Sequence, residues 1–334
     1  MIYFPLYGIN LLYHNKGEFE MLIQTILGSI AIGSMAGIYN ILKNSEETEE
    51  EILIDNIVKY EYFPVEMHDI LEDKNIIRYQ YIEGEKEGLN FYLGNNVNAE
   101  VGEDEEVKID LLDGSILIGG MTGSGKSNIL NVLITSLMLT YTKNEVCFLG
   151  SDLACSDVFY FNKYKHFIGV TSTHQGFLDQ VKWLEEQYKQ RAKILNEANC
   201  RNVISYNKKY NKKLSYIVFV IDEVVLLTAN EKCKKKLHEI MCVGRKYGCY
   251  FVLCLQDATK DTIGKCKMNC PQVIGLKTND ETDSNTIIGK NQNLQDINVV
   301  GRCKVKTKNG VTEVQSFYIE EDEMERLLKH NLKD

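Results

Sequence analysis

The sequence predicts an α/β protein with a mainly parallel sheet covered by helices, preceded by a small β-rich domain and an N-terminal apolar helix. Three observations carry this prediction. From residue 111 onward, short apolar runs alternate with longer stretches of helical periodicity, a pattern typical of parallel strands joined by crossover helices. Residues 52–110 hold short β-prone runs separated by glycine and acidic turns, as in small β domains. Residues 21–42 form one long uncharged apolar run.

The alternation can be followed element by element. Strands are expected at 115–120, 145–151, 216–223 and 250–256, and helices at 128–139, 176–195 and 233–244. Earlier β-prone runs lie at 76–82 and 89–94. The predicted domains are an N-terminal anchor segment at 1–43, an acidic linker at 44–51, a small β-rich domain at 52–110 and the main α/β domain at 111–334.

Composition excludes a disordered or collagen-like chain, because 44% of residues are hydrophobic and only three are proline. The net charge of -9 hides an asymmetry. Residues 1–110 carry 7 basic and 22 acidic side chains, whereas residues 111–334 carry 31 basic and 25 acidic side chains. The larger part of the chain is therefore basic, and the acidic total does not exclude nucleic acid as a partner.

The ten cysteines all lie between Cys147 and Cys303 and include no CxxC pair. A zinc site needs clustered ligands at closer spacing. The cysteines are therefore expected to be reduced structural thiols of a cytosolic protein.

The apolar run at 21–42 is 22 residues long, enough to cross a bilayer. Within it Ser29, Gly33 and Gly37 recur every four residues, which lets membrane helices approach closely. A cleavable signal peptide is disfavoured, because no basic residues precede the run closely and Glu18 and Glu20 stand in their place. The alternatives are a buried helix of a soluble domain and an amphipathic surface helix.

The most specific motif is GMTGSGKS at 120–127, which follows an expected strand and precedes an expected helix. This is the phosphate-binding P-loop pattern. Its glycines shape a loop of backbone N–H groups, Lys126 supplies a cation for the β- and γ-phosphates, and Ser127 supplies a hydroxyl for Mg²⁺. ATP and Mg²⁺ are thus the expected ligands. The candidate nucleotide-binding residues are Gly120, Met121, Thr122, Gly123, Ser124, Gly125, Lys126, Ser127 and Asn128.

Two further strand ends carry candidate catalytic groups. The run YIVFVIDE ends in Asp222 and Glu223, which suit a carboxylate that holds Mg²⁺ and a base that polarises the attacking water. The run YFVLCLQ ends in Gln256, a candidate sensor of the γ-phosphate. A purely structural strand-end glutamine is the alternative for that residue.

These motifs, together with WLEEQYKQRAKIL, CRNVISYN, GRKYG and DSNTIIG in that order, resemble the FtsK/SpoIIIE family of DNA-pumping ATPases. The resemblance covers roughly residues 89–320. It implies a RecA-like P-loop motor domain, a hexameric ring and ATP-driven movement of DNA through that ring. It also implies catalytic roles for Glu223, Gln256 and Arg245, and it places Arg245 near the subunit boundary. Family positions of less defined role are matched by Arg191, Arg201, Asn202, Tyr206 and Asn207.

The chain departs from the family in places. It reads Gly150-Ser151-Asp152-Leu153 where the family commonly has Asp-Pro-Lys after its second strand, and the usual arginine is missing around Asp283. The identity of a trans-acting arginine therefore stays open between Arg245 and Arg302. The chain also ends soon after the motor core, which favours a mobile-element translocase similar to the coupling ATPases of Gram-positive conjugative elements. Relaxase or secretion-channel proteins are the partners this implies.

A lysine group follows the sensor strand, where a ring ATPase would place a pore loop. Its members, the candidate DNA-binding residues, are Lys260, Lys265 and Lys267. Contacts to DNA phosphates through such residues are independent of base sequence. The alternative is an ordinary solvated face.

Two other functions stay open at this point. One is a protein-secretion motor like the type VII ATPases, which the single P-loop disfavours. The other is a nucleotide-switched assembly scaffold, which the intact Asp222–Glu223 pair disfavours. If residues 21–42 span the cell membrane once, the need for ATP places the nucleotide site in the cytoplasm.

Overall fold

The computed structural model describes residues 5–6, 9–10, 77–79, 81, 88–99, 106–210, 213–256 and 266–333. The chain divides into two units, Met1–Asp69 and Ile70–Asp334. In the first unit, the short strands β1 (Pro5–Leu6) and β2 (Ile9–Asn10) pair antiparallel. The predicted apolar helix at 21–42 and the acidic linker at 44–51 lie outside the described residues.

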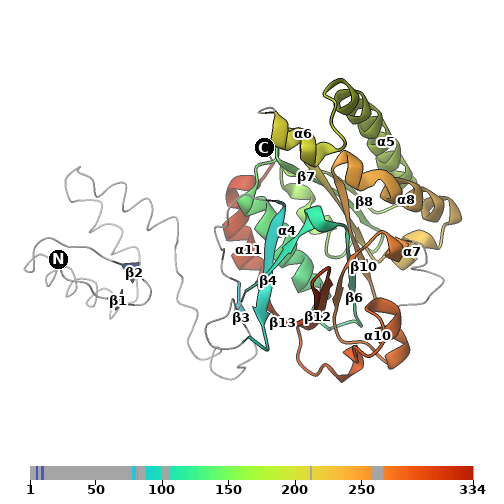
Figure 1. Ribbon diagram of the computed structural model, residues 1–334. Helices are drawn as coiled ribbons and strands as arrows, with labels where there is room; N and C mark the ends of the chain where they lie inside the picture. Colours follow the sequence, from blue (N-terminus) through green and yellow to red (C-terminus); the bar gives the residue numbers. More distant parts are fainter. Residues whose placement is uncertain are drawn as a thin grey trace, which may run out of the picture. The chain divides into compact units, whose positions relative to one another are not determined.

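The second unit is built on a large sheet, in which 11 strands are described (Figure 1). The strand order is β5-β4-β13-β12-β11-β6-β10-β9-β7-β8, and β3 also pairs with β13. The six strands from β11 to β8 run parallel to one another, whereas β12, β13, β4 and β5 continue the sheet antiparallel. The strands are β3 (Ile77–Arg78), β4 (Asn90–Asn96), β5 (Glu106–Asp110), β6 (Ile116–Gly119), β7 (Val146–Asp152), β8 (Phe167–Thr171), β9 (Tyr216–Asp222), β10 (Cys249–Leu255), β11 (Gln272–Gly275), β12 (Arg302–Thr307) and β13 (Gly310–Tyr318). The predicted α/β fold with a mainly parallel sheet is confirmed.

The central strands are mostly apolar up to their carboxyl ends because helices cover both faces of the sheet. In β9, Val218 and Val220 join one core cluster, while Ile217, Phe219 and Ile221 join the other. Successive strand side chains point to opposite faces. A strand buried on both sides therefore reads as a continuous apolar run rather than an alternating one.

The helices divide between the two faces (Figure 1). Helices α4 and α11 contribute to the first cluster, and α5, α7, α8 and α10 contribute to the second. Helix α6 begins with a capping box in which Asn202 and Ser205 each satisfy a backbone N–H of the other. The helices are α4 (Lys126–Thr140), α5 (His174–Glu197), α6 (Val203–Lys209), α7 (Val224–Thr228), α8 (Glu231–Gly244), α10 (Glu281–Ile287) and α11 (Glu321–Leu328).

Strands β4 and β5 come from the stretch predicted to form a separate β-rich domain, and both are hydrogen-bonded into the main sheet. Asp110, at the predicted boundary, accepts hydrogen bonds through Oδ1 from the N–H groups of Leu89 (2.9 Å) and Leu112 (2.8 Å). The carboxylate thus ties residues on both sides of that boundary. A separate β-rich domain is not confirmed, and these two strands extend the main sheet.

Two of the family-matching residues stabilise the edge of the sheet where the parallel strands begin. Buried Arg191 on α5 donates to the carbonyl oxygen of Tyr247 (2.5 Å) and to Ser215 Oγ (3.3 Å). Asn207 on α6 pairs with both the carbonyl and the N–H of Leu214, at 2.8 and 2.7 Å. These contacts fix the segments that lead into β9 and β10, so both residues have a structural role.

All ten cysteines lie in the described part of the chain, and all are free thiols. Six are buried, including Cys249 and Cys303, and burial raises the pKa of each of these two thiols to about 12. Groups of three or more His, Cys, Asp or Glu side chains able to hold a metal ion are absent from the described residues. The six buried thiols therefore act as small apolar core groups.

None of the helices in the described ranges has the length and apolarity needed to cross a membrane. The predicted anchor at 21–42 lies outside those ranges and stays a prediction.

The close approach of β4 and β13 gives a stability prediction. A Cβ at Gly94 would lie 2.0 Å from the carbonyl oxygen of Gln315 and 2.6 Å from Ser316 Cα, whereas one at Gly169 on β8 would meet nothing within 4 Å. We expect Gly94→Ala to lower the free energy of unfolding by roughly 1–3 kcal/mol, because the two strands must separate. Urea unfolding followed by circular dichroism measures this change. Gly169→Ala is the matched control and should shift stability by less than about 0.5 kcal/mol; equal effects of the two variants would refute the steric argument.

Candidate active site

The loop from Gly120 to Gly125 joins β6 to α4 and has a shape that only glycine allows at two positions. Gly123 has φ +78° and Gly125 has φ +105°, values that residues with a side chain rarely adopt. A Cβ on Gly125 would also lie 3.0 Å from the backbone N and Cα of Gly301. Backbone geometry therefore requires both glycines, and close packing is a second requirement at Gly125 alone.

Neighbouring backbone holds this loop at both ends of its turn. Met121 donates its N–H to the carbonyl of Lys277 (2.8 Å), and Gly301 donates to the carbonyl of Ser124 (3.0 Å). Helix α4 begins immediately afterwards, and its N-cap has no side chain to occupy the first N–H groups. Such a helix start presents open N–H donors to an anion.

The parallel register gathers the other candidate groups at the same edge of the sheet. Asp152 at the end of β7 and Asp222 at the end of β9 are register partners. Leu255 at the end of β10 is the partner of Gly119, the last residue of β6. Gln256 therefore follows its strand directly beside the phosphate loop.

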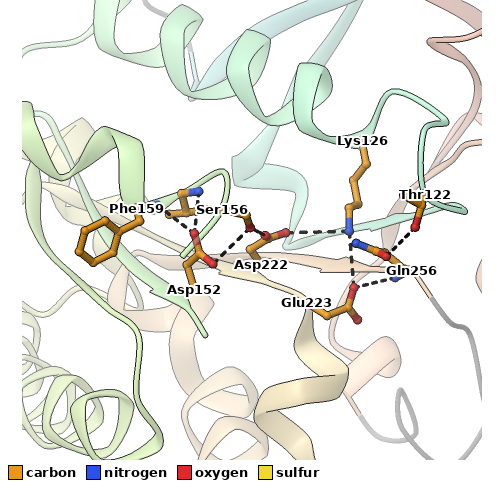
Figure 2. A network of polar contacts seen from close by, with 9 residues as sticks. Thr122, Lys126, Asp152, Ser156, Phe159, Asp222, Glu223 and Gln256 are labelled. Atoms are coloured by element: carbon orange, nitrogen blue, oxygen red, sulfur yellow. Dashed lines mark hydrogen bonds and ion pairs between the residues drawn. The ribbon is translucent and has the colours of Figure 1, made fainter. Parts of the chain in front are cut away.

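Lys126 lies between two carboxylates (Figure 2). Its Nζ is 4.0 Å from Asp222 Oδ1 and 3.6 Å from Glu223 Oε2, and the side chains of Lys126 and Asp222 are 8% and 5% exposed. Neither Lys126 Nζ nor Asp222 Oδ1 has a hydrogen-bond partner among the described residues. Buried charged atoms without hydrogen bonds are unfavourable, so this cation and this oxygen are suited to a ligand that supplies the missing contacts.

Glu223 has a conformation that is unusual for a residue with a side chain. Its φ is +52°, a left-handed value that is uncommon for non-glycine residues and frequent at functional sites. Its Oε2 accepts the backbone N–H of Gln256 (3.1 Å), and the Gln256 side-chain oxygen accepts from Thr122 Oγ1 (2.8 Å). Figure 2 shows the resulting chain from the phosphate loop through Gln256 to Glu223 and Lys126.

Burial raises the pKa of both strand-end carboxyl groups above their ordinary values. For Asp222 the hydrogen bond from Ser156 and the charge of Lys126 oppose this rise, and the charges of Asp157 and Asp152 add to it. For Glu223 the charge of Lys126 opposes the rise and that of Asp222 adds to it. A carboxylate with a raised pKa is a stronger base toward water, which suits the role predicted for Glu223.

The donor set fits Mg²⁺. Asp222 Oδ1 is a buried oxygen without a hydrogen-bond partner in the described part of the protein, and it faces the phosphate loop. Ser127 is exposed in the first turn of α4. Mg²⁺ in nucleotide sites is held by one or two protein oxygens, phosphates and waters, and Asp222 and Ser127 would be those protein oxygens.

Comparison with known proteins decides the family. The model of the FtsK/SpoIIIE family matches residues 90–259, just over half of the chain. The chain belongs to the FtsK/SpoIIIE family. The predicted resemblance is thereby confirmed, and membership of this family implies ATPase activity.

Relatives support the assignment over a wider region. The "DNA translocase FtsK" of Clostridium acetobutylicum is 28% identical over 271 residues, which cover 76% of this chain and 34% of the relative. The chain thus spans about a third of the length of that curated relative.

Solved structures share the fold. The pCW3 conjugation coupling protein TcpA, in its monomer form with ATPγS, has a TM-score of 0.65 and 24% identity, covering 78% of this chain and 75% of TcpA. EssC (ATPases 2 and 3) from Geobacillus thermodenitrificans has a TM-score of 0.66 and 20% identity, covering 77% of this chain and 51% of EssC. The predicted similarity to a conjugation coupling ATPase is confirmed at the level of fold.

The FtsK-like motif GRKYG lies far from this edge of the sheet. Arg245 is exposed in a short turn that precedes β10, whereas Gln256 follows β10. The seven residues of β10 place these two positions roughly 20 Å apart. Arg245 therefore cannot reach the nucleotide site of its own subunit. Arg302, the other candidate arginine, bonds Gln315 and Glu313 on β13.

Two other predicted binding residues have partners within the protein. Asn128 donates to the carbonyl of Phe317 (2.5 Å) and accepts from the N–H of Ile319 (3.0 Å), which ties α4 to the end of β13. Lys267 is half-buried and donates to the carbonyl of Thr286. Burial and the nearby Lys306 lower the pKa of Lys267. Lys260 and Lys265 lie outside the described residues.

Sequence reasoning did not name Ser156 as a site residue. It lies in the loop after β7, and its hydroxyl reaches Asp222 Oδ2 at 2.8 Å. The position of Asp152 at a strand end was the available signal, because carboxyl ends of parallel strands share one edge. The contact itself depends on the path of the loop, which has no sequence signature.

The geometry separates the roles of Lys126 and Glu223. We expect Lys126→Ala to weaken binding of a non-hydrolysable ATP analogue about 10- to 100-fold, because a charged hydrogen bond to phosphate is lost. Glu223→Gln should keep that binding and lower turnover about 10²- to 10⁴-fold, because the base is lost. Calorimetry and phosphate release measure the two quantities.

An exposed lysine on α5 provides the control, and Lys193→Ala should leave both quantities unchanged. Near-normal turnover in Glu223→Gln would remove this residue from the role of base.

Proposed function

We propose that this chain is an ATP-driven DNA translocase that acts as a hexameric ring and serves conjugative or mobile-element DNA transfer. The observation that carries the proposal is the buried Lys126 between Asp222 and Glu223 beside a phosphate loop, in a chain of the FtsK/SpoIIIE family. Residues 111–334 carry more basic than acidic side chains, 31 against 25. This excess of positive charge favours a polyanionic substrate.

Lys126 exchanges partners when nucleotide binds. Without phosphate its ammonium is offset by Asp222 and Glu223. The β- and γ-phosphates offer stronger, charge-assisted hydrogen bonds, and the N–H groups of the loop and of α4 bind the same oxygens. Both carboxylates are then released from their common cation.

Glu223 then serves as the base for the attacking water. Its backbone geometry and the N–H of Gln256 fix the carboxylate at the sheet edge, and its raised pKa favours acceptance of a proton. Mg²⁺, when bound, offsets the charge that develops on the phosphates. Gln256 touches both Glu223 and Thr122 of the loop, so it can register the change in the nucleotide.

A ring gives Arg245 a role that a single subunit does not. Its position at the opposite edge of the sheet from the phosphate loop supports action on the site of a neighbouring subunit. An arginine supplied in this way stabilises charge in the transition state of phosphoryl transfer. Arg302 is the weaker candidate because Gln315 and Glu313 already bind its guanidinium.

A protein-secretion motor is the second candidate, because the Type VII Secretion ATPase EccC of Thermomonospora curvata has a similar fold (TM-score 0.63, 17% identity). The excess of basic over acidic residues in 111–334 favours DNA over that alternative. A nucleotide-switched scaffold remains the third, since it would share the same binding site without sustained turnover.

One experiment separates the three candidates. We expect ATP turnover by the full chain to rise when double- or single-stranded DNA is added, and Glu223→Gln to abolish the rise. Electron microscopy with a non-hydrolysable analogue should show six-fold rings. An ATP turnover rate that does not change when DNA is added would favour a secretion motor. Nucleotide binding without ATP turnover would favour a scaffold.

The DNA contacts are tested by the salt dependence of DNA affinity. Lys260→Ala with Lys265→Ala should lower the slope of log affinity against log salt by roughly one unit per lost phosphate contact. Lys267→Ala should add less, because its ammonium already binds the Thr286 carbonyl. The matched control is Lys208→Ala with Lys209→Ala on α6, and equal slopes in all variants would make the lysine group a solvated face.

We also propose that residues 21–42 anchor the protein in the cell membrane with the ATPase domain in the cytoplasm. The basis is the length of the uncharged run and its small-residue stripe. Membrane neighbours such as secretion-channel proteins, and a relaxase delivering DNA, are the partners that this location would bring together.

The anchor can be tested without shortening the chain. The full chain should stay in the membrane pellet after a high-salt wash and be released by detergent. Ile30→Lys with Ile32→Lys should move it to the supernatant, because charges at the centre of a span cost about 2.5–3.5 kcal/mol each. A wild-type chain found wholly in the supernatant would favour the buried helix instead.

A further inference from the structure

Two buried carboxylates lie side by side at the carboxyl edge of the sheet, and one hydroxyl group lies between them. Asp152 and Asp222 are 0% and 4% exposed and are register partners on β7 and β9. Ser156 Oγ is 2.8 Å from Asp222 Oδ2 and 3.4 Å from Asp152 Oδ1 (Figure 2). A serine hydroxyl has one proton to donate, and the shorter distance assigns it to Asp222.

Asp152 determines where Ser156 lies. Its Oδ2 accepts the N–H groups of Val158 (3.1 Å) and Phe159 (3.0 Å), which bends the loop after β7 back toward the strand end. Cys155 adopts a left-handed φ of +55° within this bend. Ser156 itself is exposed, so its hydroxyl covers the two buried carboxylates on their solvent side.

The hydrogen bond from Ser156 gives the two carboxylate oxygens of Asp222 different environments. Oδ2 is held by Ser156, whereas Oδ1 faces Lys126 at 4.0 Å and has no hydrogen-bond partner in the described ranges. Rotation of the carboxylate would break the 2.8 Å bond. Ser156 therefore keeps Oδ1 directed at the phosphate loop, where Mg²⁺ would be held.

We propose that Ser156 is a positioning residue for the Mg²⁺–nucleotide complex, acting by fixing the orientation of the Asp222 carboxylate. This inference rests on the proposed ATPase function. Groups that orient a metal ligand from outside typically change metal affinity 10- to 100-fold when removed. The competing explanation is that Ser156 only stabilises its loop.

Metal dependence of binding distinguishes the two explanations. Binding of a non-hydrolysable ATP analogue to the full chain is measured by calorimetry across a range of Mg²⁺ concentrations and in EDTA. We expect Ser156→Ala to raise the Mg²⁺ concentration for half-maximal tightening about tenfold and to leave binding in EDTA unchanged. Ser156→Thr keeps a hydroxyl and should restore the midpoint to within about threefold of the wild type.

Cys155→Ala is the matched control, since it alters the same loop one residue away and removes no contact to Asp222. It should have the wild-type Mg²⁺ midpoint. Thermal unfolding of each variant separates loop stability from metal affinity. A Ser156→Ala midpoint equal to that of wild type, whatever its melting temperature, would overturn the proposal and leave the ATPase function intact. If the wild-type chain shows no Mg²⁺-dependent nucleotide binding, the proposed function itself fails.

Discussion

The site depends on one charge balance: a buried ammonium, Lys126, faces two carboxylates at the edge of a parallel sheet. Taking charges out of water is costly unless each one is paired and hydrogen-bonded. Here the pairing is incomplete, because Lys126 Nζ and Asp222 Oδ1 have no hydrogen bond within the described residues. Glycines at positive φ keep the adjoining loop open. The arrangement is therefore electrostatically unfavourable until phosphate and a divalent cation supply the missing contacts. Binding of these ligands to the folded protein then stabilises it.

The sheet assigns different tasks to its two edges. Carboxyl ends of β6, β7, β9 and β10 bring the phosphate loop, the acidic groups and Gln256 together. The amino ends carry the hydrogen bonds of Arg191 and Asn207 and the exposed Arg245. The family-matching residues therefore fall into two groups. One group lies at the carboxyl ends of the strands and forms the nucleotide site, and the other lies at the amino ends, where Arg191 and Asn207 stabilise the fold and Arg245 is exposed. In the proposed ring, a neighbouring subunit that contacts the amino ends of the strands would be connected to the nucleotide site through the hydrogen-bonded sheet.

Local patterns made much of this site predictable. A phosphate loop and a strand ending in two acids are contiguous in sequence, so Lys126, Asp222 and Glu223 could be named directly. Ser156 could not be named, because its role comes from strands whose paired residues, Asp152 and Asp222, are 70 positions apart. Asn128 was placed among nucleotide-binding residues by its neighbours in sequence, yet its amide binds backbone 189 residues away. The joining of β4 and β5 to the main sheet is likewise a long-range pairing, whereas the local pattern of β-prone runs separated by glycine and acidic turns suggested a separate domain.

Gln256 contacts both the proposed base and the phosphate loop. Its backbone N–H holds the proposed base, and its side chain is held by Thr122 of the phosphate loop. When phosphate draws Lys126 away from Glu223, the loop and the base both shift their charge environment, and Gln256 is bonded to each. A change at either group must therefore alter the backbone of residue 256. Lys260 and Lys265 follow within nine residues of the chain. In the proposed translocase, the candidate DNA-binding lysines are therefore close in sequence to the residue that contacts both the base and the phosphate loop.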